Sequence, residues 1–222
     1  VRGALAELGK LLAEYESAIA DPEASLEEKE EIAQDMKRSI QLASNAAERV
    51  ASFVRSIKTQ TRGGIPQERQ RFNAVPVIRE TLLLVGYQLR KGGCTTVFEP
   101  VASYIELYGS PGQLAQIITN LVTNSIDASI PKGGGPITLR LTPSNNGIDL
   151  QVSDVGCGIP PENISRIFDP LFSTKPFGQG IGLGLTIVRN IVTGEFGGTI
   201  DVTSQPGQGT TFTVHFPNPQ EA

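Results

Sequence analysis

Two glycine-rich segments decide the fold: Asp154-Val-Gly-Cys-Gly-Ile159 and, further along the chain, Gly178-Gln-Gly-Ile-Gly-Leu-Gly-Leu185. Residues 148–152 alternate apolar and polar side chains, which predicts a half-buried strand running into Asp154. A carboxylate there can accept hydrogen bonds from an exocyclic amine, and bare glycines let a flat ring approach closely. In the second segment the glycines lead into a helical pattern, and a helix N-terminus offers N–H groups to phosphate. Either segment alone is typical of a mobile loop, but together they predict a nucleotide site.

A predicted helix over residues 109–130 carries a second polar signal. Its expected buried face is Leu114, Ile117, Ile118, Leu121, Val122 and Ile126. Asn120, Asn124 and Asp127 are spaced four and three residues apart, which places them together on a neighbouring face. Asparagine is a mediocre helix former, and its carbonyl oxygen suits a hard divalent cation that bridges phosphates. Without the glycine segments, this pattern would indicate only a solvated helix face.

Residues 1 to about 62 predict an antiparallel helical hairpin. Apolar residues recur at heptad spacing at positions 5, 8, 12, 15 and 19, and again at 32, 36, 40, 43, 47, 50, 54 and 57. Asp21-Pro22 ends the first helix, and Ser25 with Glu28 forms a capping box for the second. A lone hairpin buries little surface, so we expect a homodimer in which two hairpins form a four-helix bundle. The alternative is packing of the hairpin against its own downstream domain.

The segment Gly63-Gly-Ile-Pro66 is a predicted break, which divides a hairpin domain, 1–64, from a second domain, 65–222. The second domain has predicted strands at 71–75, 94–99, 104–108, 137–142, 147–153, 198–204 and 210–216, and predicted helices at 77–91, 109–130 and 185–192. Strands and helices mix without regular alternation. This order favours an α+β fold, a two-layer sandwich with one mixed sheet and helices on one face.

Composition excludes several classes of function. The net charge is −4, and the basic residues gather only at Arg62, Arg69 and Arg71, so a nucleic-acid partner is not expected. No apolar run is long enough to span a membrane. The two cysteines, Cys94 and Cys157, lie far apart, which fits a reducing compartment. We expect a cytoplasmic location, either of the whole protein or as the cytoplasmic part of a larger, membrane-anchored protein.

Five segments resemble, in order, the successive boxes of sensor histidine kinases. They are Asn120-Leu-Val-Thr-Asn-Ser-Ile-Asp-Ala128, Asp154-Val-Gly-Cys-Gly-Ile159, Ile167-Phe-Asp-Pro-Leu-Phe-Ser-Thr-Lys175, Gly180-Ile-Gly-Leu-Gly-Leu185 and Gly207-Gln-Gly-Thr-Thr-Phe212. The resemblance covers residues 65–217, and it implies a superfamily that includes gyrase, Hsp90 and MutL. The hairpin is similar to the dimerisation and phosphotransfer domain that precedes the ATP-binding domain in these kinases.

The resemblance implies two cofactors, ATP and Mg²⁺, and a role for each matching residue. Asn124 would be the metal ligand, Asp154 would accept from the adenine amine, and residues 168–180 would form a mobile lid. Asn120 and Lys175 would act in catalysis near the phosphates. The implied cofactor-binding set is Asn120, Asn124, Asp127, Asp154, Gly156, Gly158, Ile159, Ser173, Thr174, Lys175, Gly180, Ile181, Gly182, Leu183, Gly184, Leu185 and Thr210.

One position separates a kinase from an ATPase. In the hydrolytic relatives, the residue four before the metal asparagine is a glutamate that activates water. Here that residue is Asn120, which cannot act as a general base. We therefore expect ATP to be held for transfer of its γ-phosphate to a protein histidine and on to a response regulator receiver domain. Asn120 and the hairpin together disfavour an ATPase of the gyrase or MutL kind.

The acceptor histidine of that family is missing from the first helix. The chain has a single histidine, His215, on the last predicted strand, where we expect it to be exposed. Either the sequence starts just after the acceptor or the protein has lost it, and we expect the first. The second would make the chain a non-catalytic, nucleotide-gated interaction module.

Overall fold

The structure is a computed structural model that describes residues 2–22, 24–61, 69–175 and 182–218. The chain divides into two compact units, Val1–Gly64 with Thr174–Ile181 and Ile65–Ser173 with Gly182–Ala222. Each unit is taken in turn below. Within the described ranges, no helix has the length and apolar character that crossing a bilayer requires.

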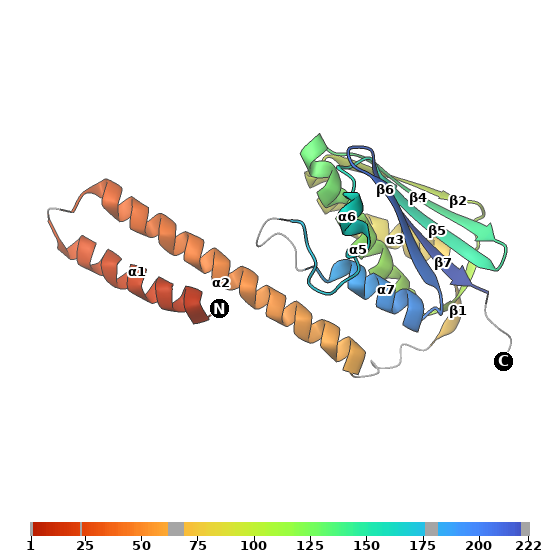
Figure 1. The fold of residues 1–222 in the computed structure, drawn as a ribbon, viewed down its shortest axis with the longest axis horizontal. Coiled ribbons are helices and arrows are strands. Elements are labelled where there is room, and N and C mark those ends of the chain that lie inside the picture. Colours follow the sequence, from red (N-terminus) through yellow and green to blue (C-terminus); the bar gives the residue numbers. More distant parts are fainter. Residues whose placement is uncertain (1, 23, 62–68, 176–181, 219–222) are drawn as a thin grey trace. The chain divides into compact units, whose positions relative to one another are not determined.

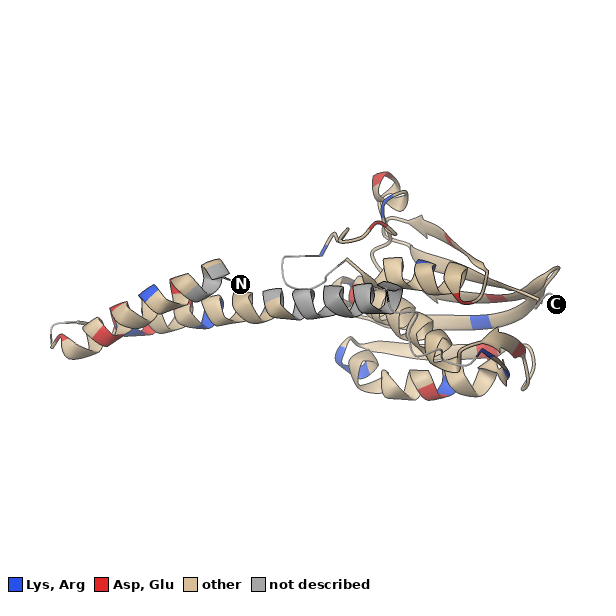
Figure 2. Ribbon diagram, turned by 90° about the horizontal axis from the view of Figure 1, so that it is seen from below, with Lys and Arg blue, Asp and Glu red and all other residues tan. Residues whose placement is uncertain are grey.

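The first unit is a helical hairpin of α1 (Arg2–Ala20) and α2 (Leu26–Thr61), which lie antiparallel and pack along each other (Figure 1). The N-cap bond of the predicted capping box is present, because the Ser25 hydroxyl accepts a hydrogen bond from the Glu28 N–H at 3.1 Å. Ala18 and Ser39 are buried between the helices. Acidic residues are frequent toward the end where α1 and α2 are joined (Figure 2). Glu27 and Glu28 lie in the first turn of α2.

The second unit contains a five-stranded mixed sheet in the order β2-β4-β5-β7-β6. Only β2 and β4 are parallel, and the other neighbours are antiparallel. The strands are β2 (Cys94–Pro100), β4 (Gly135–Ser144), β5 (Gly147–Asp154), β6 (Thr199–Gln205) and β7 (Gly209–Pro217). A separate antiparallel ribbon pairs β1 (Gln70–Asn73) with β3 (Glu106–Gly109).

The helices cover one face of this sheet, with α5 in the middle between α3 and α7 (Figure 1). They are α3 (Ala74–Leu84), α4 (Gly86–Lys91), α5 (Pro111–Ser129), the 3₁₀ turn η1 (Ile130–Lys132), α6 (Pro161–Ile164) and α7 (Gly184–Gly194). Ser110 caps α5 by accepting from the Gln113 N–H at 3.3 Å, and Pro111 is pre-set for the first turn. All six predicted core residues of α5 are buried against the sheet. The predicted two-layer α+β sandwich is thus confirmed.

The structure corrects two element boundaries. The predicted helix over 77–91 is two helices, because the chain breaks at Val85, where φ is −85° and ψ is 1°. The predicted strand over 71–75 ends at Asn73, whose side chain accepts from the Val75 N–H at 3.2 Å and so starts α3 early.

His215 is also different from expectation. It is half-buried rather than exposed, and its Nδ1 lies 2.7 Å from the Asp149 carboxylate on the neighbouring strand β5. The Ser144 hydroxyl lies 3.3 Å from the same nitrogen. The pairing arises because antiparallel β5 and β7 place these two residues directly opposite each other.

Candidate nucleotide-binding site

Asp154 stands at the end of the central strand β5 with its carboxylate almost fully buried. Oδ1 accepts hydrogen bonds from the Gly156 N–H at 2.9 Å and the Thr210 N–H at 3.2 Å. Oδ2 accepts from the Ser125 hydroxyl at 2.9 Å. A carboxylate oxygen has about two lone-pair directions, so Oδ2 keeps one acceptor position that a ligand donor can use.

Burial dominates the electrostatics of this carboxylate. Desolvation raises the pKa of Asp154 above its ordinary value, although the hydrogen bonds from Gly156, Ser125 and Thr210 lower it in part. The three donors stabilise the charged form, in which both oxygens accept. The group is therefore built to accept hydrogen bonds in a site from which water is largely removed.

A second set of polar contacts supports the loop that follows Asp154. The Ser204 hydroxyl accepts from the Ile159 N–H at 2.8 Å and lies 3.0 Å from the Thr210 hydroxyl. It also donates to the Gly209 carbonyl at 2.9 Å. Three segments of the chain are thus joined at one half-buried hydroxyl, which also contacts Thr210, the residue whose N–H donates to Asp154.

The glycines of the first segment have a structural reason that the sequence did not reveal. A Cβ on Gly156 would approach the Ala128 carbonyl oxygen at 2.6 Å. Gly158 has a φ of +71°, and a Cβ there would lie 2.1 Å from the Gln205 carbonyl oxygen. Both positions are needed for close approach of the protein's own backbone, on α5 and on β6, in addition to any approach of a ring.

The asparagines of α5 meet the second glycine segment. Asn120, Asn124 and Asp127 are half-buried along one side of the helix. A Cβ on Gly184, the first residue of α7, would lie 3.7 Å from Asn120 Oδ1 and 3.8 Å from Asn124 Nδ2. The N-terminal end of α7 therefore faces both asparagines. Among the described residues, the buried Nδ2 of Asn120 has no hydrogen-bond partner.

Two contacts hold the N-terminal end of α7. Gly182 has a φ of +70° and passes so close to Phe172 that a Cβ would lie 2.4 Å from the Phe172 carbonyl oxygen. The Thr186 hydroxyl donates to the Phe168 carbonyl at 3.0 Å. Leu183 is buried and Leu185 half-buried, so both serve the packing of this end.

The roles of the other predicted residues are not tested by these contacts. Gly180 and Ile181 lie outside the described residues, as does the end of the predicted lid. Thr174 and Lys175 group with the hairpin unit, while Ser173 is the last residue of its segment in the second unit. Their roles stay predictions.

Sequence reasoning missed Ser125 and Ser204, which hold Asp154 and its loop. The available signal for Ser125 was a polar residue within the apolar stripe of the helix, one position after Asn124. A buried serine there needs a partner, and Asp154 is that partner. Ser204 gave no signal, because alternating serine and threonine residues are ordinary at the end of a strand.

The sequence of the chain is similar to that of a known protein family and of several known proteins. Residues 109–220, half of the chain, match the family described as histidine kinase-, DNA gyrase B- and HSP90-like ATPase. Sensor histidine kinase ZraS of Escherichia coli K12 is 41% identical over 112 residues, which are 50% of this chain and 23% of that protein. Sporulation kinase A of Bacillus subtilis 168 is 33% identical over 151 residues, 67% of this chain and 24% of the relative.

A solved structure of the catalytic domain of histidine kinase ThkA superposes with a TM-score of 0.59 at 31% identity, covering 68% of this chain and 95% of that one. The chain therefore belongs to the histidine kinase-, DNA gyrase B- and HSP90-like ATPase family. It carries the nucleotide-binding domain of that family, and its relatives include sensor histidine kinases. The chain spans less than a third of the length of the curated relatives quoted above.

Proposed function

We propose that this chain is the ATP-binding part of a sensor histidine kinase, which holds ATP and donates its γ-phosphate to a histidine for relay to a response regulator. The observation that carries the proposal is the buried Asp154, whose oxygens are held by three protein donors and keep one acceptor position open. The kinase class of the relatives supports the choice of reaction.

Asp154 provides base recognition in this proposal. The exocyclic amine of adenine donates to Oδ2, where the Ser125 hydroxyl leaves one lone pair free. A guanine would present a carbonyl oxygen at the same place, and two acceptors would face each other without a proton between them. A buried site that discriminates by hydrogen bonding rejects the wrong group strongly, because its own polar atoms are left unpaired.

The phosphates would lie between α5 and the first turn of α7. Gly184 leaves room beside Asn120 and Asn124, and the free N–H groups of a helix N-terminus favour anions. The unpartnered Nδ2 of Asn120 would donate to a phosphate oxygen. Amide oxygens fit Mg²⁺, which accepts few protein ligands and completes its shell with water and phosphate. When bound through Asn124, Mg²⁺ would neutralise phosphate charge.

The proposed transfer of the γ-phosphate rests on two residue types that are missing: a general base at position 120 and a histidine in residues 1–64. An amide at position 120 cannot take a proton from water, so rapid hydrolysis has no base at this position. Residues 1–64 contain no histidine, so we propose that the acceptor imidazole lies outside this sequence. Neutral imidazole attacks through a lone pair and needs no base beforehand, unlike a serine or tyrosine hydroxyl.

We also propose that the hairpin, with its boundary near residue 64, forms a homodimer. Leu12, Ile19 and Ile40 are 46%, 60% and 49% exposed in the single chain, although they lie at heptad positions. Association with a second hairpin would bury them in a four-helix bundle. A receiver domain is the proposed phosphate-accepting partner, by analogy with the ThkA structure described as a complex with response regulator TrrA.

The absence of histidine from residues 1–64 favours one alternative, a non-catalytic module in which nucleotide only changes conformation. Single-turnover incubation with γ-labelled ATP tests the choice. The proposal expects bound ATP to label a histidine-bearing longer form of the chain, and the label to disappear in the Asn124→Ala variant. Tight ATP binding with no transfer to any histidine would support the alternative instead.

A further inference from the structure

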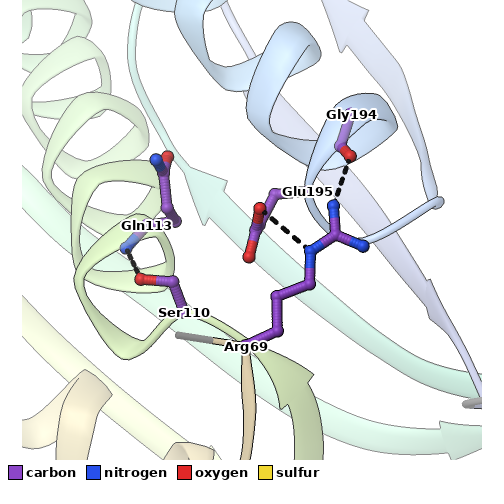
Figure 3. A network of polar contacts seen from close by, with 5 residues as sticks. All are labelled: Arg69, Ser110, Gln113, Gly194 and Glu195. Carbon is purple, nitrogen blue, oxygen red and sulfur yellow. Dashed lines mark hydrogen bonds and ion pairs between the residues drawn. The ribbon is translucent and has the colours of Figure 1, made fainter. Parts of the chain in front are cut away.

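Arg69 connects the start of the second unit to the far end of α7 (Figure 3). Its Nη2 donates to the carbonyl of Gly194, the last residue of α7, at 3.0 Å. Its Nε lies 3.4 Å from the Glu195 carboxylate. The partners are 125 residues apart in sequence, so the contact joins two distant segments.

A helix C-terminus needs such a partner. The last carbonyls of a helix have no intrahelical donor, and the helix dipole makes this end negative. The guanidinium supplies both a donor and a positive charge. The Glu195 side chain is only 20% exposed, and among the described residues its Oε1 has no hydrogen-bond partner. Without Arg69, this carboxylate would lose that ion pair.

The same helix begins at the nucleotide site. Gly184, at the N-terminal end of α7, faces Asn120 and Asn124, while Gly194 is the last residue of this 11-residue helix. The helix has buried residues along its whole length, namely Thr186, Val188, Ile191 and Val192, so it packs as a rigid unit. A displacement of its C-terminal end along the helix axis would therefore also displace its first turn.

Arg69 itself is placed by the ribbon that it precedes. The next residue starts β1, and Gln70 pairs with Gly109 at the end of β3. Gly109 has no side chain, and a Cβ there would lie 2.5 Å from the Phe196 ring, which follows α7 directly. The ribbon thus abuts the C-terminal end of α7 at two points, through Arg69 and through Gly109.

We propose that Arg69 and Glu195 form a clamp that fixes α7 against β1 and thereby positions the Gly184 end of the helix for nucleotide. Both residues of the clamp lie in the second unit. The effect on affinity rests on the proposed function, whereas the effect on the helix does not. Arg69 and Glu195 are positioning residues, since neither touches the nucleotide site.

The test compares Arg69→Ala with Arg71→Ala, a matched control that removes another exposed arginine–glutamate pair of the same ribbon, Arg71–Glu106 at 2.7 Å. Hydrogen exchange of α7 is followed without nucleotide, and the dissociation constant for ADP is measured by titration under folded conditions. We expect Arg69→Ala to speed exchange at residues 184–187 as well as at 192–196. We expect affinity to fall by about two- to thirty-fold, the range of coupling through residues remote from a ligand. Arg71→Ala should change neither.

Two conservative variants, Arg69→Lys and Glu195→Gln, separate the contribution of charge from that of hydrogen-bond geometry. Lysine keeps the charge but not the planar fork that reaches both partners, so its exchange at 184–187 should lie between those of wild type and alanine. Faster exchange confined to residues 192–196 would mean that Arg69 is only a local cap, and would overturn the clamp. Changed exchange at 184–187 with no ADP binding by wild type would support the clamp and reject the proposed function. Changed exchange there with unchanged ADP affinity would overturn the link to the nucleotide.

Discussion

Replacement of Asp154 by asparagine is the sharpest test of base recognition. In the native site Oδ1 accepts from the Gly156 and Thr210 amides, so the retained oxygen of asparagine must face them. The new NH₂ group then takes the place of Oδ2. It faces the Ser125 hydroxyl, which can rotate to accept. In the proposed complex it would also face the adenine amine, which cannot accept. One ligand hydrogen bond is lost, and two donors are brought together.

The loss of that bond corresponds to about 1–3 kcal/mol of binding free energy. This predicts ADP binding weaker by about 5- to 150-fold at neutral pH. Asp149→Asn is the control, because it makes the same change on the same strand, where the partner is His215. Isothermal titration calorimetry with ADP and GDP measures both variants.

We expect Asp154→Asn also to narrow the preference for adenine over guanine, since the NH₂ group can donate to the guanine carbonyl. The free energy of unfolding without nucleotide should change little, because the variant removes a charge whose burial is unfavourable. Unchanged ADP affinity in Asp154→Asn would refute the assignment of the base site. A loss of equal size in Asp149→Asn would refute it as well.

Three further predictions concern the protonation of Asp154, its loop and the hairpin. Burial raises the pKa of Asp154 above its ordinary value of 3.8, so the folded state takes up a proton at higher pH than the unfolded chain. As pH falls from the raised pKa toward the ordinary pKa, the free energy of unfolding should therefore increase through protonation of Asp154, while the affinity for ADP decreases. If the Asp154→Asn variant showed the same dependence of stability on pH as the wild type, this prediction would be contradicted. Gly158→Ala should lower the melting temperature far more than Gly207→Ala. Both glycines have a positive φ, but only the new Cβ at position 158 would meet a carbonyl oxygen, at 2.1 Å. Equal decreases in melting temperature would count against the loop geometry. By light scattering at micromolar concentration, the Ile40→Glu variant should be a monomer, whereas the control variant Gln34→Glu should be a dimer. The same molecular mass for both variants would reject the proposed dimer face.

The order of elements and the buried face of α5 could be predicted from the sequence, because both depend on local periodicity. Leu114, Ile118 and Leu121 repeat with the helical period, and such a stripe must face a core. The break at Val85 could not be predicted, since residues 77–91 keep a helical pattern throughout. Gly86, directly after the break, was the one local sign, and an isolated glycine within a helical pattern is often tolerated.

For the candidate site too, some residues could be predicted from the sequence and others could not. Aspartate at the end of a buried strand and asparagine within a helix are unusual residue types for those places, so the sequence alone made Asp154, Asn120 and Asn124 candidates. The contacts that hold them cross large distances along the chain: Ser125 to Asp154 spans 29 residues and Arg69 to Gly194 spans 125. Such contacts depend on how strands and helices assemble, and no local pattern announces them.

The central claim is that bound ATP is a phosphate donor to histidine. The direct measurement is incubation of γ-labelled ATP with a longer form of the chain that includes a histidine in its first helix, alongside the same form carrying Asn124→Ala. The account predicts acid-labile, base-stable label on the first and none on the second, with slow release of free phosphate from both. Steady hydrolysis without labelled protein, or bound ATP that labels nothing, would contradict it.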